Sequence, residues 1–175
     1  MLQNYINLIN HNRYLKINYK NNYNYSKLDK ITINIQFKKN INNKFTLLCI
    51  FFLFKDIIHK NGYFIILNKR NKKILGMKYT LKNNLMYQFL TFLITNFLNQ
   101  PEIQNNIKLS SFDTKGNYVL GLSNFSYYYF EKLLQNKNFK NVLNCFNLIF
   151  IFKFKNNSNF YNNIFYLNLF KLYFL

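Results

Sequence analysis

Side chains suited to acid–base or metal chemistry are few and scattered along this 175-residue chain. His11 and His59 are isolated, and the chain has only 5 acidic residues. Neither histidine has a partner at the spacing of a metal site or a catalytic triad. Cys49 and Cys145 lie far apart in apolar stretches, so we expect buried free thiols. There is no carboxylate pair for general acid–base catalysis and no glycine-rich phosphate loop. We therefore expect no enzymatic activity, no metal and no cofactor.

Positive charge is the chemistry that the sequence does offer. The chain has 24 Lys and Arg against 5 Asp and Glu, a formal net charge of +19. A compact chain with this charge repels itself unless a polyanion or an acidic surface neutralises it. RNA, DNA and anionic membranes are therefore the candidate partners. Half of the residues are hydrophobic, which excludes a disordered basic tail as a description of the whole chain.

The amino-acid usage indicates a biased genome. Ala is absent, Gly and Pro number 4 and 1, and Asn, Ile, Lys, Phe and Tyr dominate. These five residues share A- and T-rich codons, so we expect an organelle-encoded protein, of a mitochondrion first and of a plastid as the alternative. The N-terminus has neither a signal-peptide core nor the composition of a transit peptide, which is consistent with synthesis inside the organelle.

Several elements must position the charged residues. Residues 30–37 alternate β-branched and polar side chains, and residues 147–155 alternate in the same way, so both are expected strands. Residues 76–81 and 118–122 are shorter strand candidates. Helices are expected over residues 42–54 and 84–98, with a basic N-terminal helix at 2–19 and an aromatic C-terminal helix within 157–175. The prediction is one α+β domain over residues 1–175, an antiparallel sheet with helices packed on one face.

Apolar stretches raise the question of a membrane span. Residues 45–54 are too few to cross a bilayer as a helix, and residues 83–101 are uncharged but interrupted by polar side chains. Their apolar residues recur at helical spacing, which favours an amphipathic helix of a soluble domain. The alternative function is an organelle-encoded subunit of a membrane complex without RNA binding, and a free RNA-binding module is a third.

Residues 113–117 form a polar segment between two strand candidates. Its composition predicts a turn, in which Gly116 can adopt positive φ at little cost. Asp113, Lys115 and Asn117 could be taken for a binding site, but a role in stabilising the turn is at least as well supported.

Two collinear blocks resemble a known family. Residues 74–98 and 108–122 are similar to the bacterial-type large-subunit ribosomal protein L5 family, whose members associate with 5S rRNA and carry segments like IGCKVTLRGERMYEFL and KSFDGRGNYTLGI. The positions that match these segments are Gly76, Lys78, Thr80, Leu81, Met86, Tyr87, Phe89, Ser111, Phe112, Asp113, Gly116, Asn117, Tyr118, Leu120 and Gly121. With weaker matches in the flanking strands, the resemblance covers residues 28–155.

Some family positions differ here. The family has a Gly-Gln-Lys/Arg-Pro turn before its mobile loop, and this chain has a different sequence there, around Phe54 and Asp56. The family's Arg-Gly pair after the Thr-Leu strand corresponds to Lys82 and Asn83. The Pro of a Phe-Pro-Glu motif near Glu131 is also missing.

The resemblance implies a structural constituent of the large ribosomal subunit in the central protuberance. Its rRNA partner would be 5S rRNA where present, or large-subunit rRNA, and the expected rRNA-binding residues are Asn34, Lys38, Lys39, Lys78, Thr80 and Lys82. A basic loop within residues 59–73 would face the peptidyl-site tRNA through Lys60, Lys69, Arg70, Lys72 and Lys73. Other ribosomal proteins, including one of the small-subunit head, are further expected partners.

Overall fold

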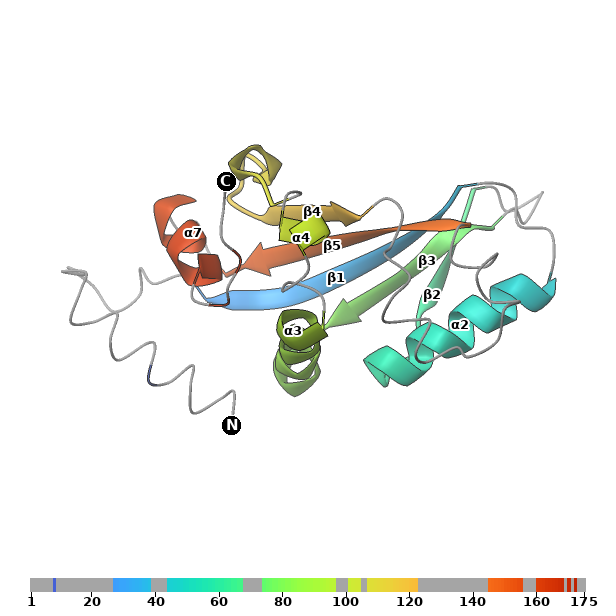
Figure 1. The fold of residues 1–175 in the computed structure, drawn as a ribbon. Coiled ribbons are helices and arrows are strands. Elements are labelled where there is room, and N and C mark those ends of the chain that lie inside the picture. The colour runs from blue at the N-terminus through green and yellow to red at the C-terminus, as the bar shows by residue number, and fades with distance from the viewer. Residues whose placement is uncertain are drawn as a thin grey trace. The chain divides into compact units, whose positions relative to one another are not determined.

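A computed structural model describes residues 8, 27–38, 44–67, 74–96, 101–104, 107–122, 145–155, 160–168, 170 and 172. Within them the helices and strands follow the order β1 (Leu28–Phe37), α2 (Lys44–Ile58), β2 (Tyr63–Ile66), β3 (Ile74–Leu81), α3 (Asn83–Asn96), α4 (Pro101–Gln104), η1 (Leu109–Ser111), β4 (Tyr118–Leu122), β5 (Phe146–Phe154) and α7 (Phe160–Asn168) (Figure 1). The strands form one antiparallel sheet in the order β2-β3-β1-β5-β4. The predicted α+β class with an antiparallel sheet is confirmed.

Alternation of side chains along β1 explains why this segment forms a strand. Ile31, Ile33 and Ile35 are each 0% exposed, whereas Asn34 is half-buried and Gln36 is exposed. Successive side chains of a strand point to opposite faces, so the three isoleucines share the core face. Strand β5 repeats the pattern, with Phe146, Leu148, Phe150 and Phe152 buried.

The chain divides into two compact units. The first, called the α2 unit, comprises Thr32–Leu81 and Leu120–Ile151; the second, called the α3 unit, comprises Met1–Ile31, Lys82–Val119 and Phe152–Leu175. Strands β1, β4 and β5 contribute residues to both. The expectation of one domain over residues 1–175 stays a prediction.

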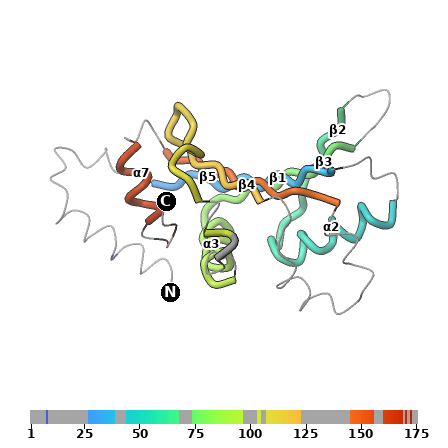
Figure 2. Tube along the Cα trace, turned by 45° about the horizontal axis from the view of Figure 1, so that its top comes forward, coloured from blue at the N-terminus to red at the C-terminus, as the bar shows by residue number. Residues whose placement is uncertain are grey.

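The core of the α2 unit is formed where α2 meets the sheet (Figure 2). Ile50, Phe54 and Ile58 recur every four residues, so they lie on one side of α2, and each is at most 4% exposed. The ring of Phe54 lies 6.2 Å from that of Tyr79 and 5.6 Å from that of Phe146. These contacts assign the side chains of Tyr79 and Phe146 to the same face of the sheet, which α2 covers.

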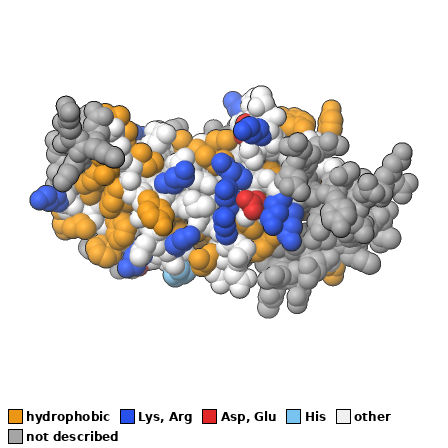
Figure 3. Space-filling model, turned by 180° about the vertical axis from the view of Figure 1, so that it is seen from behind, with side chains coloured by type: hydrophobic (Ala, Val, Ile, Leu, Met, Phe, Trp, Pro, Cys, Tyr) orange, Lys and Arg blue, Asp and Glu red, His pale blue; other side chains and the backbone are white. Residues whose placement is uncertain are grey.

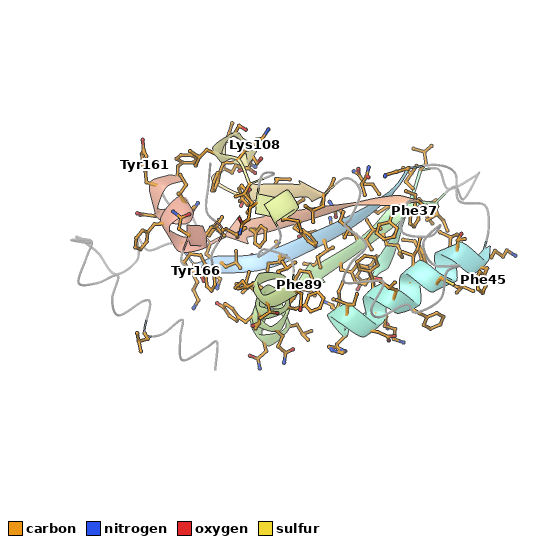
Figure 4. The ribbon with its side chains drawn as sticks, viewed as in Figure 1. Phe37, Phe45, Phe89, Lys108, Tyr161 and Tyr166 are labelled. Carbon is orange, nitrogen blue, oxygen red and sulfur yellow. The ribbon has the colours of Figure 1, made fainter. Side chains whose placement is uncertain are left out.

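The core of the α3 unit is built from α3, α7 and the strand ends of that unit. Helix α3 buries Met86, Phe89, Leu90 and Leu93, as its periodicity predicts. Tyr166 of α7 packs against Phe154 at a ring distance of 5.8 Å and against Phe170 at 5.0 Å. Figure 4 shows Tyr166 turned from α7 towards the end of β5.

Several predicted boundaries differ from the structure. Helix α2 continues to residue 58, beyond the predicted end at 54, whereas its predicted start at 42 lies outside the described residues. The C-terminal helix is described over 160–168, within the predicted 157–175. Neither Cys49 nor Cys145 forms a disulfide, as expected, but both are half-buried rather than buried. Helix α3 is described as far as Asn96, the predicted end at residue 98 lies outside the described residues, and a separate helix begins at Pro101. The basic helix predicted for residues 2–19 lies, apart from Leu8, outside the described residues.

Candidate nucleic-acid interface

A polar surface lies on the side of the α2 unit's sheet opposite its core. On β3, Met77 and Tyr79 are buried while Lys78 is exposed and Thr80 half-buried, so the latter two face away from α2. On the neighbouring strand β1, Asn34 and Gln36 face the same way by the same alternation. On β5, Asn147 lies between the buried residues Phe146 and Leu148, so its side chain also faces away from α2. We call the surface formed by Asn34, Gln36, Lys78, Thr80 and Asn147 the outer face.

Gly76 sets the close approach of the two strands that carry most of this face. A Cβ atom at Gly76 would overlap the carbonyl oxygen of Ile35 on β1. No side chain fits there without displacing backbone, so glycine is required where β3 passes β1. Because Lys78 and Thr80 follow on the same side of β3, Gly76 helps to fix their position beside Asn34.

An exposed tyrosine extends the outer face along β2. Tyr63 is paired with Lys78 in the antiparallel register of β2 and β3, and it is 73% exposed. Directly opposite residues of antiparallel strands project on the same side. The outer face therefore has an aromatic ring beside an ammonium group. Figure 3 views the protein from behind and shows basic and hydrophobic side chains interspersed on this side.

Sequence reasoning missed Tyr63 and Asn147. Tyr63 belongs to a run, YFII, in which all four residues are exposed, so no alternation distinguished it. Asn147 was placed at the start of a strand but not assigned a role, although it alternates with Leu148 in the same way as Asn34 alternates with Ile33. The side-chain oxygens of Asn34 and Asn147 are buried and accept no hydrogen bond within the described structure.

Lys60 occupies a structural position at the start of the basic loop. Its ammonium group donates a 2.6 Å hydrogen bond to the main-chain carbonyl of Thr80. This bond ties the residues after α2 to the end of β3, next to the outer face. The other predicted residues of the tRNA-facing loop, which are Lys69, Arg70, Lys72 and Lys73, lie outside the described residues, as does Lys39.

Lys38 and Lys82 lie at the ends of the neighbouring strands β1 and β3. Lys38 directly follows β1, is exposed, and its N–H donates to the carbonyl of Cys145 at 2.8 Å, which aligns β1 with β5. Lys82 directly follows β3, is exposed, and belongs to the α3 unit. Of the six predicted rRNA-binding residues, the structure therefore brings together Asn34, Lys78 and Thr80, with Lys38 continuing the same strand.

The turn at residues 113–117 is stabilised from within. One carboxylate oxygen of Asp113 accepts the N–H groups of Lys115 at 3.0 Å and Asn117 at 2.7 Å, and the other accepts the Asn117 side-chain amide at 2.8 Å. Gly116 has the predicted positive φ, 74°. Burial raises the pKa of Asp113, but these hydrogen bonds and the charge of Lys115 together outweigh it, so the pKa is lowered.

Asn117 also connects this turn to the sheet. Its side-chain oxygen accepts the N–H of Phe154 on β5 at 3.3 Å, while its main chain pairs with that of Asp113. The polar groups of Asp113 and Asn117 are therefore largely used inside the protein. This geometry favours the turn-stabilising role over a binding role, and Lys115, whose side chain is exposed, is the residue that remains accessible.

Metal binding and membrane insertion are two further possibilities that the described residues allow to be checked. It contains no group of three or more His, Cys, Asp or Glu that could hold a metal ion. None of its helices is both long and apolar enough to span a bilayer.

Comparison with known proteins identifies a relationship over half of the chain. The model of the ribosomal L5 family C-terminus matches residues 74–167, from the first residue of β3 into α7. Lys78, Thr80, Lys82 and the turn at 113–117 fall within the match, whereas Asn34, Lys60 and Tyr63 precede it. No curated protein matches the chain.

Proposed function

The chain belongs to the ribosomal L5 family and is thus a large-subunit ribosomal protein, and on this premise we propose that it binds ribosomal RNA through the outer face. The observation that carries the proposal is the placement of Lys78 and Thr80 on β3 beside Asn34 on β1. All three point away from the core of the α2 unit.

The chemistry of the outer face suits folded RNA. A-form helices hide their major groove, so proteins recognise them by shape and by contacts to phosphates and 2′-hydroxyl groups. Lys78 supplies a cation for a phosphate, and the hydroxyl and amide of Thr80 and Asn34 can hydrogen-bond to sugars. Tyr63 adds a ring on which an unpaired base can stack, next to Lys78.

The rRNA bound by this face is proposed to be 5S rRNA where the ribosome contains it, and large-subunit rRNA otherwise. Gly76, Ser111, Phe112, Asp113 and Gly116 match the 5S-associated family at positions that shape the fold. Family likeness supports 5S rRNA, and the polar outer face is compatible with either molecule.

The basic loop within residues 59–73 is proposed to contact the peptidyl-site tRNA. Lys69, Arg70, Lys72 and Lys73 provide four cations within five residues. The bond from Lys60 to Thr80 supports the base of this loop next to the outer face. A contact with a protein of the small-subunit head is proposed from the family relationship alone.

The ribosome concerned is proposed to be mitochondrial, since the codon bias behind the amino-acid usage is typical of a small organelle genome. A plastid ribosome is the alternative. We propose a structural, non-enzymatic role in it, as expected for a ribosomal protein of this family.

Salt-dependent binding of the full chain to purified rRNA tests this function. The wild-type chain should bind 5S or large-subunit rRNA with an affinity that falls steeply with salt. Lys78→Gln should weaken binding and lower the log–log salt slope by about 1. Lys44→Gln is the matched control, because it removes the same charge from an exposed position on α2.

The result that would overturn the proposal is equal loss of affinity in both variants, or no effect of either. Each would mean that the outer face has no particular part in RNA binding. Tyr63→Leu separates stacking from charge, because it should weaken binding without changing the salt slope.

A further inference from the structure

Helix α2 is apolar on both of its sides. Ile50, Phe54 and Ile58 face the core and are at most 4% exposed. Phe45, Leu48 and Phe52 are 67%, 53% and 53% exposed. Their spacing of three and four residues places them on one stripe, which lies opposite the core side by the 100° rotation per residue of a helix. Figure 4 shows Phe45 at the beginning of α2.

A helix that is apolar all round is normally buried all round. Exposed apolar surface of this kind on a folded protein marks a contact with another molecule. The exposed stripe is not isolated, because Phe52 packs edge-on against Phe51 at 5.7 Å, and Phe51 stacks on Phe64 of β2 at 5.9 Å. Phe64 is itself 43% exposed, so the apolar surface continues from α2 onto β2.

Two lysines mark the ends of the stripe. Lys44 and Lys55 are exposed and 11 positions apart, which is three helical turns, so both lie beside Leu48 on the same side of α2. Asp56 is the single acidic residue of this helix. Asp56 is exposed and follows Phe52 by four positions, so it flanks the stripe on the side opposite Lys55. The complementary surface is therefore an apolar strip with a carboxylate opposite each lysine, about 16 Å apart at 1.5 Å per residue, and a basic group opposite Asp56.

We propose that this stripe, defined as Lys44, Phe45, Leu48, Phe52 and Lys55, is a docking surface for an amphipathic acidic helix of a neighbouring protein in the ribosomal particle. Helices pack along one another at 8–10 Å when apolar ridges interdigitate, which Phe45, Leu48 and Phe52 permit. Leu48 at the centre offers nothing to a phosphate or a base, so a protein fits better than RNA. An acidic partner also reduces the self-repulsion of a chain with net charge +19.

Because the neighbour is sought within the ribosomal particle, the docking proposal rests on the proposed function.

Photo-crosslinking tests the docking proposal, with Leu48→p-benzoylphenylalanine in the full chain incorporated into large subunits. The matched control is Gln88→p-benzoylphenylalanine, an exposed position on α3. At position 48 we expect an adduct with a peptide of another ribosomal protein that has apolar residues at helical spacing and two acidic residues about three turns apart. At position 88 we expect no such adduct.

A synthetic peptide of the crosslinked segment then provides the quantitative test. Fluorescence anisotropy should show binding to the full wild-type chain and an affinity at least about tenfold lower for Lys44→Glu with Lys55→Glu. Phe52→Ser should weaken binding by a similar factor, and Lys78→Glu should not. Phe52→Ser is expected to fold normally because its side chain is half exposed, which unfolding curves for the variant verify.

Adducts to rRNA, lipid, a second copy of this chain or another part of the same chain would each overturn the proposal, as would no adduct. Failure of the proposed function is distinguishable, since the chain would then not sediment with large subunits at all. A chain that sediments with the subunit but forms no protein adduct at position 48 contradicts the docking surface alone.

Discussion

The side-chain amide of Asn163 donates a 2.8 Å hydrogen bond to the main-chain carbonyl of Gly116, 47 residues earlier in the chain. Asn163 is 0% exposed and lies on α7, while Gly116 is the positive-φ residue of the turn before β4. A buried carbonyl rarely remains without a donor. The bond therefore holds the C-terminal helix against the turn that the family motif specifies.

Asn163→Ala should lower the free energy of unfolding by about 1–3 kcal/mol, because it leaves the Gly116 carbonyl without its side-chain donor in a buried position. Urea denaturation of the full chain measures the change. Asn61→Ala serves as the control, since Asn61 is exposed and its loss should change stability by less than about 0.5 kcal/mol. Equal effects of the two substitutions would show that the Asn163 bond is unimportant.

Gly76→Ala should destabilise the α2 unit by about 1–3 kcal/mol, because the added methyl group meets the carbonyl of Ile35 and forces β3 away from β1. Gly121→Ala is the matched control in another strand, where nothing lies within 4 Å of the added carbon. Thermal unfolding should therefore separate the two variants clearly. A Gly76→Ala protein as stable as the Gly121→Ala protein would contradict the close approach of the strands.

Asn83→Val should cost about 1–2 kcal/mol, because Asn83 has a φ of 53° and a β-branched residue is strained in the left-handed region. The resembled family has glycine here, so Asn83→Gly should be tolerated with little change in stability. Unfolding curves of both variants provide the comparison. If valine were accepted as well as glycine, the backbone at the start of α3 would not have this conformation.

Asp113 should make stability depend on pH in the acidic range. Its pKa is lowered from the ordinary 3.8 in the folded protein, so the carboxylate stabilises the fold above the pKa of the unfolded chain. This contribution is lost as pH falls through the lower, folded-state pKa. Asp113→Asn should therefore flatten the decline of stability below about pH 4, which denaturation at a series of pH values measures. An unchanged decline would place the titrating group elsewhere.

The alternation of residues in β1 and β5 made the strands and the placement of Asn34 predictable from sequence. The pattern could not place Tyr63, because its position on the outer face depends on pairing with Lys78 across β2 and β3. The hydrogen bond that Lys60 donates could not be predicted from sequence either, since its acceptor is a main-chain carbonyl 20 residues away. The end of α2 was also missed, because Lys55 and Asp56 interrupt an apolar run although Ile58 still packs in the core.

The turn at 113–117 was likewise predictable only in part, because some of its contacts are local and others are long-range. Its composition predicts the positive φ of Gly116, and Asp113 stabilises it through bonds to residues two and four positions later. The link from Asn117 to Phe154 joins residues 37 positions apart and depends on the folded sheet. Local chemistry thus predicts the turn, and tertiary structure decides that its polar groups are used internally.

A cryo-electron microscopy map of the assembled large subunit tests the central claim most directly, because it shows what covers the outer face. The expected result is rRNA in contact with Asn34, Lys78 and Thr80, with a phosphate at the ammonium group of Lys78. An outer face left open to solvent, or covered by protein while rRNA binds another surface of the chain, would contradict it.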